Sequence, residues 1–167
     1  MCMMSSETRP ALVAPGTVVG LVVDDGNLVV SDTSGELRVR SEDGDVDLRQ
    51  VNGSVEVNVD DGDLRLDGVL TVLRAYSEDG DLELRAHAGS SMEDDWAIHA
   101  DDGDMSLVLP DDFAADLSLS SDDGPIEVEP PVAVRGRVSR HRLSGQLNGG
   151  GHELRVRSDD GHITIRR

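Results

Sequence analysis

The chain has 167 residues, and its 34 acidic and 15 basic side chains give it a formal net charge of −19. This length favours a single domain. The sequence contains no run of about 18 consecutive apolar residues, so we expect no membrane span. Because an acidic surface repels phosphate backbones, we also expect no nucleic-acid binding.

Residues 1–16 predict a loose lead-in that ends at Pro15-Gly16. A secretory signal needs a basic head and an apolar run of about 7–15 residues, and this segment has neither. We therefore expect a cytoplasmic location for the chain as written. Cys2 is the one cysteine in the sequence, so it can form no internal disulfide and complete no zinc site.

Glycines mark an internal repeat from residue 17 onward. They recur with a period of nine residues at Gly26, Gly35, Gly44, Gly53 and Gly62. Aliphatic and polar residues alternate after each glycine, which predicts a short strand with one buried face. Glycine accepts a positive φ, and aspartate can bond to nearby backbone, so the Asp-Gly pairs predict corners between strands.

The corners alternate in strength, and this alternation sets the length of one coil. Corners of the form acid-Asp-Gly lie 18 residues apart, at glycines 26, 44, 62 and 80, and they return at glycines 103, 124 and 161. An 18-residue coil therefore contains two strands. The wider spacings in the second half predict inserted loops near residues 87–95 and 130–151.

Charged residues support this register independently. Residues 18 positions apart would lie on neighbouring strands, about 4.8 Å apart. Three columns then alternate in sign, which stabilises adjacent strands modestly. The columns are Asp47, Arg65 and Glu83; Arg49, Asp67 and Arg85; and Arg38, Glu56 and Arg74.

The predicted fold is an all-β, single-domain parallel β-solenoid (β-helix or β-roll) of about seven coils, over residues 17–167. Its core is aliphatic, with Leu64 and Leu66 pointing inward in a central coil, and Trp96 is expected in the core or at a cap. The last strand ends with the chain, so we expect it at an open end where Arg166 and Arg167 guard the edge. This predicts a monomer or a weak end-to-end dimer.

The motifs of the second half carry a resemblance. Residues 145–165 read Gly-Gln-Leu-Asn-Gly-Gly-Gly-His-Glu-Leu-Arg-Val-Arg-Ser-Asp-Asp-Gly-His-Ile-Thr-Ile, and Trp96, Asp102-Gly103, Phe113 and Asp123-Gly124 precede them. This pattern resembles a bacterial adhesin family, a β-strand-repeat domain of unknown function, over about residues 17–167. The resemblance implies a β-solenoid at the cell envelope. It implies no catalytic residues.

The acidic corners suggest a metal site. Stacked carboxylates suit a hard cation such as Ca²⁺, and the candidate ligands are Asp43, Asp45, Asp61, Asp63, Asp79 and Asp81. The alternative is that the aspartate before each glycine caps the turn through its own backbone bonds while the outer acid is solvated. Neither the EF-hand nor the calcium nonapeptide pattern fits these corners. We expect no cofactor, with bound Ca²⁺ as the alternative.

These features predict a non-enzymatic, adhesin-like structural or interaction module. A cation-binding solenoid is one alternative, and a carbohydrate-active β-helix enzyme is another. Enzyme activity is not expected, because the acids repeat at every corner instead of singling out a catalytic pair. The expected partner is a protein or a surface glycan. A basic cluster that could dock an acidic partner consists of Arg135, Arg137, Arg140 and Arg142.

Overall fold

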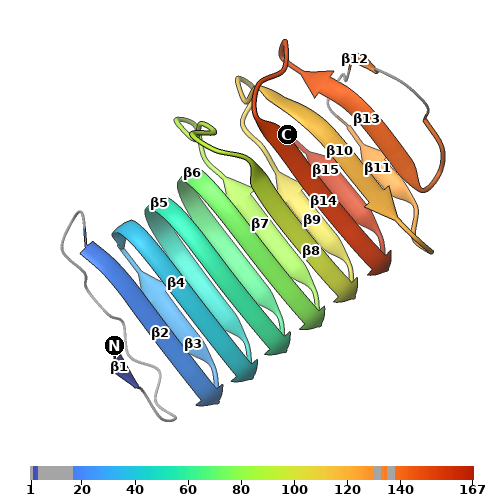
Figure 1. Ribbon diagram of the computed structural model, residues 1–167. Coiled ribbons are helices and arrows are strands. Elements are labelled where there is room, and N and C mark those ends of the chain that lie inside the picture. The colour runs from blue at the N-terminus through green and yellow to red at the C-terminus, as the bar shows by residue number, and fades with distance from the viewer. Residues whose placement is uncertain (1, 4–16, 130–132, 135–137) are drawn as a thin grey trace.

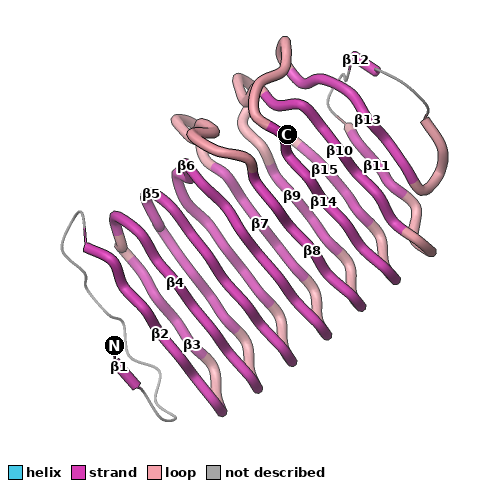
Figure 2. The backbone as a smooth tube through the Cα atoms, in the orientation of Figure 1, coloured by secondary structure: helices cyan, strands magenta, loops and turns pink. Residues whose placement is uncertain are grey.

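A computed structural model describes residues 2–3, 17–129, 133–134 and 138–167 (Figure 1). These residues form strands, turns and loops, with no helix among them (Figure 2). The strands are β1 (Cys2–Met3), β2 (Thr17–Asp25), β3 (Leu28–Ser31), β4 (Ser34–Asp43), β5 (Val46–Asp61), β6 (Leu64–Asp79), β7 (Leu82–Ala86), β8 (Trp96–Asp102), β9 (Met105–Val108), β10 (Ala115–Ser121), β11 (Ile126–Val128), β12 (Ala133–Val134), β13 (Arg142–Leu147), β14 (Glu153–Asp160) and β15 (Ile163–Arg166).

The strands pair in two parallel ladders that run along the molecule. The front ladder has the order β2-β4-β5-β6-β8-β14-β10, and the back ladder has the order β3-β5-β6-β7-β9-β15-β11 (Figure 1). The long strands β5 and β6 take part in both ladders. Val46 pairs with Leu64 and Leu37 pairs with Val55, so neighbouring coils in this half are offset by the predicted 18 residues.

The core fills the space between the two ladders. Leu64 and Leu66 are buried, as predicted, because alternate residues of each strand point inward. Trp96 is also buried, and its ring lies 4.9 Å from that of Phe113. The indole Nε1 of Trp96 donates a hydrogen bond to the carbonyl of Thr71, so the polar end of this side chain is satisfied.

The last coil does not lie at the end of the ladders. Strand β14 pairs with β8 on one side and β10 on the other, and β15 likewise lies between β9 and β11. The prediction that the last strand forms an open edge guarded by Arg166 and Arg167 is therefore wrong. Arg166 forms an ion pair with Glu129 at 3.6 Å, and Arg167 forms one with Asp111 at 3.8 Å.

The described part of the segment predicted as a loop at residues 130–151 contains two strands, β12 and β13. Strand β13 pairs with β10 in antiparallel orientation, and β12 pairs with β13. Inward residues alternate along β13, with Gly145 and Leu147 buried. The described strands thus form an all-β, β-solenoid-like sheet of mixed orientation, which corrects the expectation of a uniformly parallel seven-coil solenoid.

The lead-in predicted at residues 1–16 lies outside the described residues except at Cys2 and Met3. These two residues form β1, which pairs with Leu21 and Val22 of β2. Within the described ranges, no helix is long and apolar enough to cross a lipid bilayer.

Candidate functional site

The corners between the front and back ladders are built on stacked glycines. Gly62 has a φ of 134°, which L side chains rarely adopt. A Cβ atom on Gly62 would lie 2.6 Å from the carbonyl oxygen of Gly44, which belongs to the neighbouring coil. Glycine is therefore required at this corner both by the backbone angle and by the close approach of the next coil.

At glycines 44, 62, 80 and 103, the aspartate that follows the glycine bonds to the next coil. Its Oδ1 atom accepts a hydrogen bond from a backbone N–H of the neighbouring corner, and Asn27 begins the series. The bonds join Asp45 N to Asn27 Oδ1 at 3.2 Å, Asp63 N to Asp45 Oδ1 at 3.1 Å, Asp81 N to Asp63 Oδ1 at 3.1 Å, Asp104 N to Asp81 Oδ1 at 2.9 Å and His162 N to Asp104 Oδ1 at 2.9 Å. These side chains thus link successive coils.

This series corrects the predicted turn cap. The prediction assigned the backbone bond to the aspartate before glycine, but the side chain that makes it follows the glycine and reaches a different coil. The carboxylates of Asp43, Asp61 and Asp79 are exposed, and their backbone carbonyls accept the glycine N–H groups of the preceding coils. The alternation of residue types in sequence shows that a corner exists, but it does not show which coil each aspartate contacts.

Among the described residues, the two clusters that could hold a metal ion lie away from the predicted ligands. One consists of Asp94, Asp95 and His152, and the other consists of His99, Asp101 and Asp159. In the second cluster, Nε2 of His99 lies 2.7 Å from Asp101, and Asp159 accepts a hydrogen bond from Arg157 at 3.1 Å. These carboxylates already have protein partners.

The hydroxyl of Tyr76 also donates to Asp101, at 3.0 Å. This hydrogen bond, together with desolvation and the nearby negative charges, raises the pKa of Tyr76 above its usual value. The phenol therefore stays protonated and holds Asp101 in place beside His99.

The carboxyl of Asp160, at the last corner, has a raised pKa. Desolvation by the surrounding chain raises the pKa of Asp160, and the charges of Asp123 and Asp102 and a hydrogen bond with Asp123 raise it further. Asp102 pairs with Asp160 in the ladder, so their carboxylates belong to neighbouring coils. The insertion of β14 between β8 and β10 is what brings these corners together.

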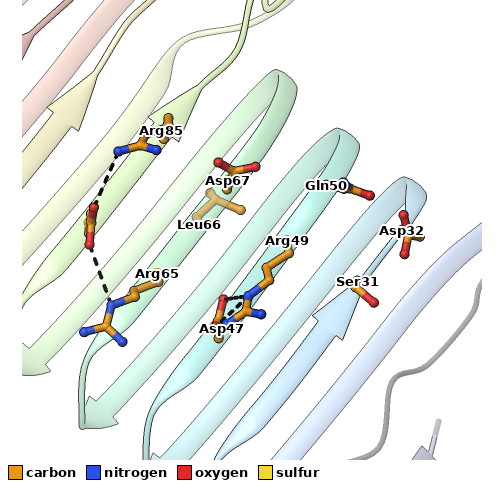
Figure 3. Close-up of a pocket in the computed structure, with 10 residues that line it drawn as sticks. Ser31, Asp32, Asp47, Arg49, Gln50, Arg65, Leu66, Asp67 and Arg85 are labelled. Carbon is orange, nitrogen blue, oxygen red and sulfur yellow. Dashed lines mark hydrogen bonds and ion pairs between the residues drawn. The ribbon is translucent and has the colours of Figure 1, made fainter.

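The outer surface of the back ladder carries a shallow groove of about 520 Å³ over β5, β6 and β7 (Figure 3). Leu66 forms part of its lining, and charged side chains of alternating sign surround it. Asp47 accepts a hydrogen bond from Nε of Arg49 at 3.0 Å. Glu83 lies 3.6 Å from Arg65 and 3.9 Å from Arg85. The predicted charge columns therefore form a neutralised, exposed grid.

The outer surface of the front ladder carries a second pocket, of about 280 Å³, over β6, β8 and β14. Arg74 and Arg155 flank Ala97 on the neighbouring strands, and Tyr76 and Arg157 flank His99. The sequence pattern does not predict this group. No local pattern could have found it, because Arg155 and Arg157 reach β8 only through the insertion of the last coil.

The predicted basic cluster is only partly described. Arg135 and Arg137 lie outside the described residues. Arg140 and Arg142 are exposed, and Arg142 begins β13. The structure thus places the two described members on or beside the antiparallel edge of the front ladder.

The sequence profile of the Toastrack domain family DUF4097, a domain of unknown function, matches residues 17–166. The comparisons found no curated protein and no solved structure that matches the chain significantly. The matched segment covers almost all of the described strands. The resemblance to a β-strand-repeat domain of unknown function is thus confirmed at this level, and the chain belongs to the Toastrack family.

Proposed function

We propose that the protein is a non-enzymatic, adhesin-like interaction module whose exposed strand faces bind a surface glycan. The observation that carries this proposal is the charged grid on the outer surface of the ladders. Arg38 and Glu56 pair across strands at 3.5 Å, as Arg65 and Glu83 do at 3.6 Å. Parallel ladders hold such side chains at a constant spacing, which suits recognition of an extended partner. A location at the cell envelope would bring the module to that partner.

The glycine corners and interlocked aspartates support a rigid presenting surface. The corner bonds between coils add to the parallel ladders, so each coil is fixed to its neighbours on two sides. Rigid surfaces lose little conformational entropy when they bind a partner. This arrangement favours a structural or binding role over one that depends on a moving lid.

The carbohydrate-active alternative has one supporting observation. The pKa of Asp160 is raised beside Asp123, and general acid catalysis uses a carboxyl whose pKa is raised. Asp160 is exposed, however, whereas a catalytic acid is typically kept protonated by an apolar pocket.

The cation-binding alternative concerns the same corner. Desolvation and the charges of Asp123 and Asp102 raise the pKa of Asp160, and a divalent cation would offset the charge repulsion among these acids. Against it, Oδ1 atoms of the predicted ligands Asp45, Asp63 and Asp81 already accept backbone hydrogen bonds. A calorimetric titration with Ca²⁺, matched in ionic strength by NaCl, separates specific binding from screening.

A glycan array tests the proposed function directly. The full chain is labelled and applied to defined neutral and acidic glycans, with the Leu66→Ala variant, heated until unfolded, as the control. We expect the labelled protein to bind a subset of the arrayed glycans. These glycans should be recovered uncleaved after prolonged incubation. Shortened products would assign an enzyme instead. If the protein binds no glycan on the array, a glycan partner is rejected and a protein remains as the ligand.

A further inference from the structure

The front-ladder pocket breaks the charge alternation of the molecule. Along one row of this face, Arg38, Glu56 and Arg74 alternate in sign from β4 to β6. The next position, on β8, is Ala97, and the position after it, on β14, is Arg155. Two arginines thus flank a small neutral residue where the pattern of the other coils would place an acid.

The neighbouring strands do not supply the missing acid. Arg155 has Ala97 and Ser118 as its cross-strand neighbours, and Arg157 has His99 and Ser120. Glu56 is the acidic residue among those that line the pocket, against three arginines. Among the residues that line the pocket, arginines therefore outnumber acids three to one.

The three arginines have acidic partners outside the row. Arg74 lies 3.6 Å from Asp94, Arg155 lies 2.5 Å from Glu153, and Arg157 lies 3.1 Å from Asp159. Arg157 also lies 3.7 Å from Asp122. Each guanidinium has five N–H donors, and these contacts leave donors that can reach across Ala97. The three side chains are more than half exposed.

Apart from Asn58, the rest of the pocket lining is apolar or aromatic. Ala97 and Ile98 belong to its lining, together with the rings of Tyr76 and His99, whose centroids lie 5.5 Å apart. The hydroxyl of Tyr76 donates a hydrogen bond to Asp101, whose carboxylate also lies 2.7 Å from Nε2 of His99. A fixed aromatic wall beside arginine donors suits a ring that carries one carboxylate.

We propose that this pocket binds a sugar ring with a single carboxylate, of the uronic acid class. Arg74 and Arg155 hold the carboxylate above Ala97, and the ring packs against Tyr76. The pocket volume of about 280 Å³ leaves room for one monosaccharide unit. The net charge of −19 disfavours a polyanionic chain, so the acidic sugar is an isolated or terminal one.

An acidic peptide is the competing occupant, and the geometry disfavours its binding as an added strand. Strand addition needs an exposed sheet edge. Strand β8 is paired on both sides, with β6 and β14, so it offers no edge at the pocket. This assignment rests on the proposed function, because it names the ligand class that the adhesin-like face would recognise.

The test is an NMR titration of the full chain with glucuronic acid, with neutral glucose and open-chain glutarate as matched probes. The backbone amides of Ala97 and His99 report on the pocket. We expect saturable shifts with glucuronic acid and binding at least about tenfold weaker for both other probes, because each lacks the carboxylate or the ring. Equal binding of glutarate would overturn the sugar assignment and favour an acidic peptide, and equal binding of glucose would overturn the role of the carboxylate.

Substitutions locate the site. Arg74→Ala and Arg155→Ala should each weaken glucuronic acid binding about tenfold or more. Arg65→Ala is the matched control, since Arg65 is also an exposed β6 arginine with an acidic partner at 3.6 Å, but on the back ladder. Ala97→Glu should abolish binding by placing a tethered carboxylate between the arginines. Loss of binding in Arg65→Ala, or retention in Arg74→Ala and Ala97→Glu, would overturn the proposed pocket.

The two proposals fail in different ways. If the native protein and Arg74→Ala bind the arrayed glycans equally well, the interaction function stands and this pocket is not its site. If glucuronic acid binds at Ala97 but the array stays empty, the pocket stands and the proposed glycan partner does not. Absence of shifts at Ala97 and His99 up to about 20 mM glucuronic acid would reject the pocket outright.

Discussion

Residues 17–86 and residues 96–167 stack similar coils in different chain orders. In the first region, neighbouring coils follow each other in the chain, and the corner bond from Asp63 N to Asp45 spans 18 residues. In the second region, the corner bond from His162 N to Asp104 spans 58 residues. The same glycine corner and the same aspartate bond therefore serve both a local and a distant contact.

This difference has a consequence for folding. Each coil of the first region can dock on the coil made just before it. Strand β10 instead pairs with β14, which comes later in the chain, and β11 pairs with β15. Since distant contacts require the closure of longer loops, we expect the second region to fold more slowly.

The largest expected effect follows from deleting residues 153–167. This removes β14 and β15, so β8 and β10 lose the strand between them. We expect β10 and β13 to lose protection from hydrogen exchange while β4 and β5 keep it, because the first coils stabilise one another. Hydrogen exchange with mass spectrometry measures this. Retained protection in β10 would mean that it can dock directly on β8.

A core substitution tests the strand phase of the regular region. Leu66 is buried, with Leu48 and Leu84 as its partners on the neighbouring strands. Leu66→Ala should lower the free energy of unfolding by about 2–5 kcal/mol because it leaves a cavity in a thin core. Thermal or urea denaturation gives the value. A midpoint shifted by less than about 2 °C would show that this side chain does not support the core.

A smaller effect is expected at the aspartate series. In Asp63→Ala the amide of Asp81 loses its acceptor, so stability should fall by about 1 kcal/mol. Asp63→Asn retains the accepting oxygen and removes a negative charge, so it should be neutral or mildly stabilising. Asp61→Asn, at the exposed position before Gly62, should likewise be nearly neutral. Equal losses in Asp63→Ala and Asp63→Asn would show that charge, not the bond, stabilises the corner.

The smallest effect concerns Asp160, whose pKa is raised above the ordinary value of 3.8. Between that value and the raised pKa, the folded state binds more protons than the unfolded state, so stability falls as pH rises through this window. Asp160→Asn should therefore be more stable than the native protein at pH 7, with the gain vanishing near about pH 3. Chemical denaturation at both pH values measures it. A gain of the same size at both would attribute the effect to packing instead of titration.

The sequence was most informative where the constraint is local. The inward phase of Leu64 and Leu66 and the 18-residue pairing of Arg38 with Glu56 were both predicted, because alternation and corner glycines act within one coil. The antiparallel strand β13 was missed because residues 142–147 lie in a segment without a repeat corner. The candidate ligands at the corners were identified as acids, but their hydrogen-bond partners lie on other coils.

The amino-acid sequence by itself determined the repeating unit: glycine corners, an inward aliphatic face and an outward charged face. The order of the coils in the second region was decided only by the tertiary structure. Any strand with an aliphatic face and a glycine corner can stack on another, so local pattern does not choose between β14 and β10 as the neighbour of β8. That choice brings Arg74 and Arg155 to the two sides of Ala97, and the pocket on the front ladder exists because of it.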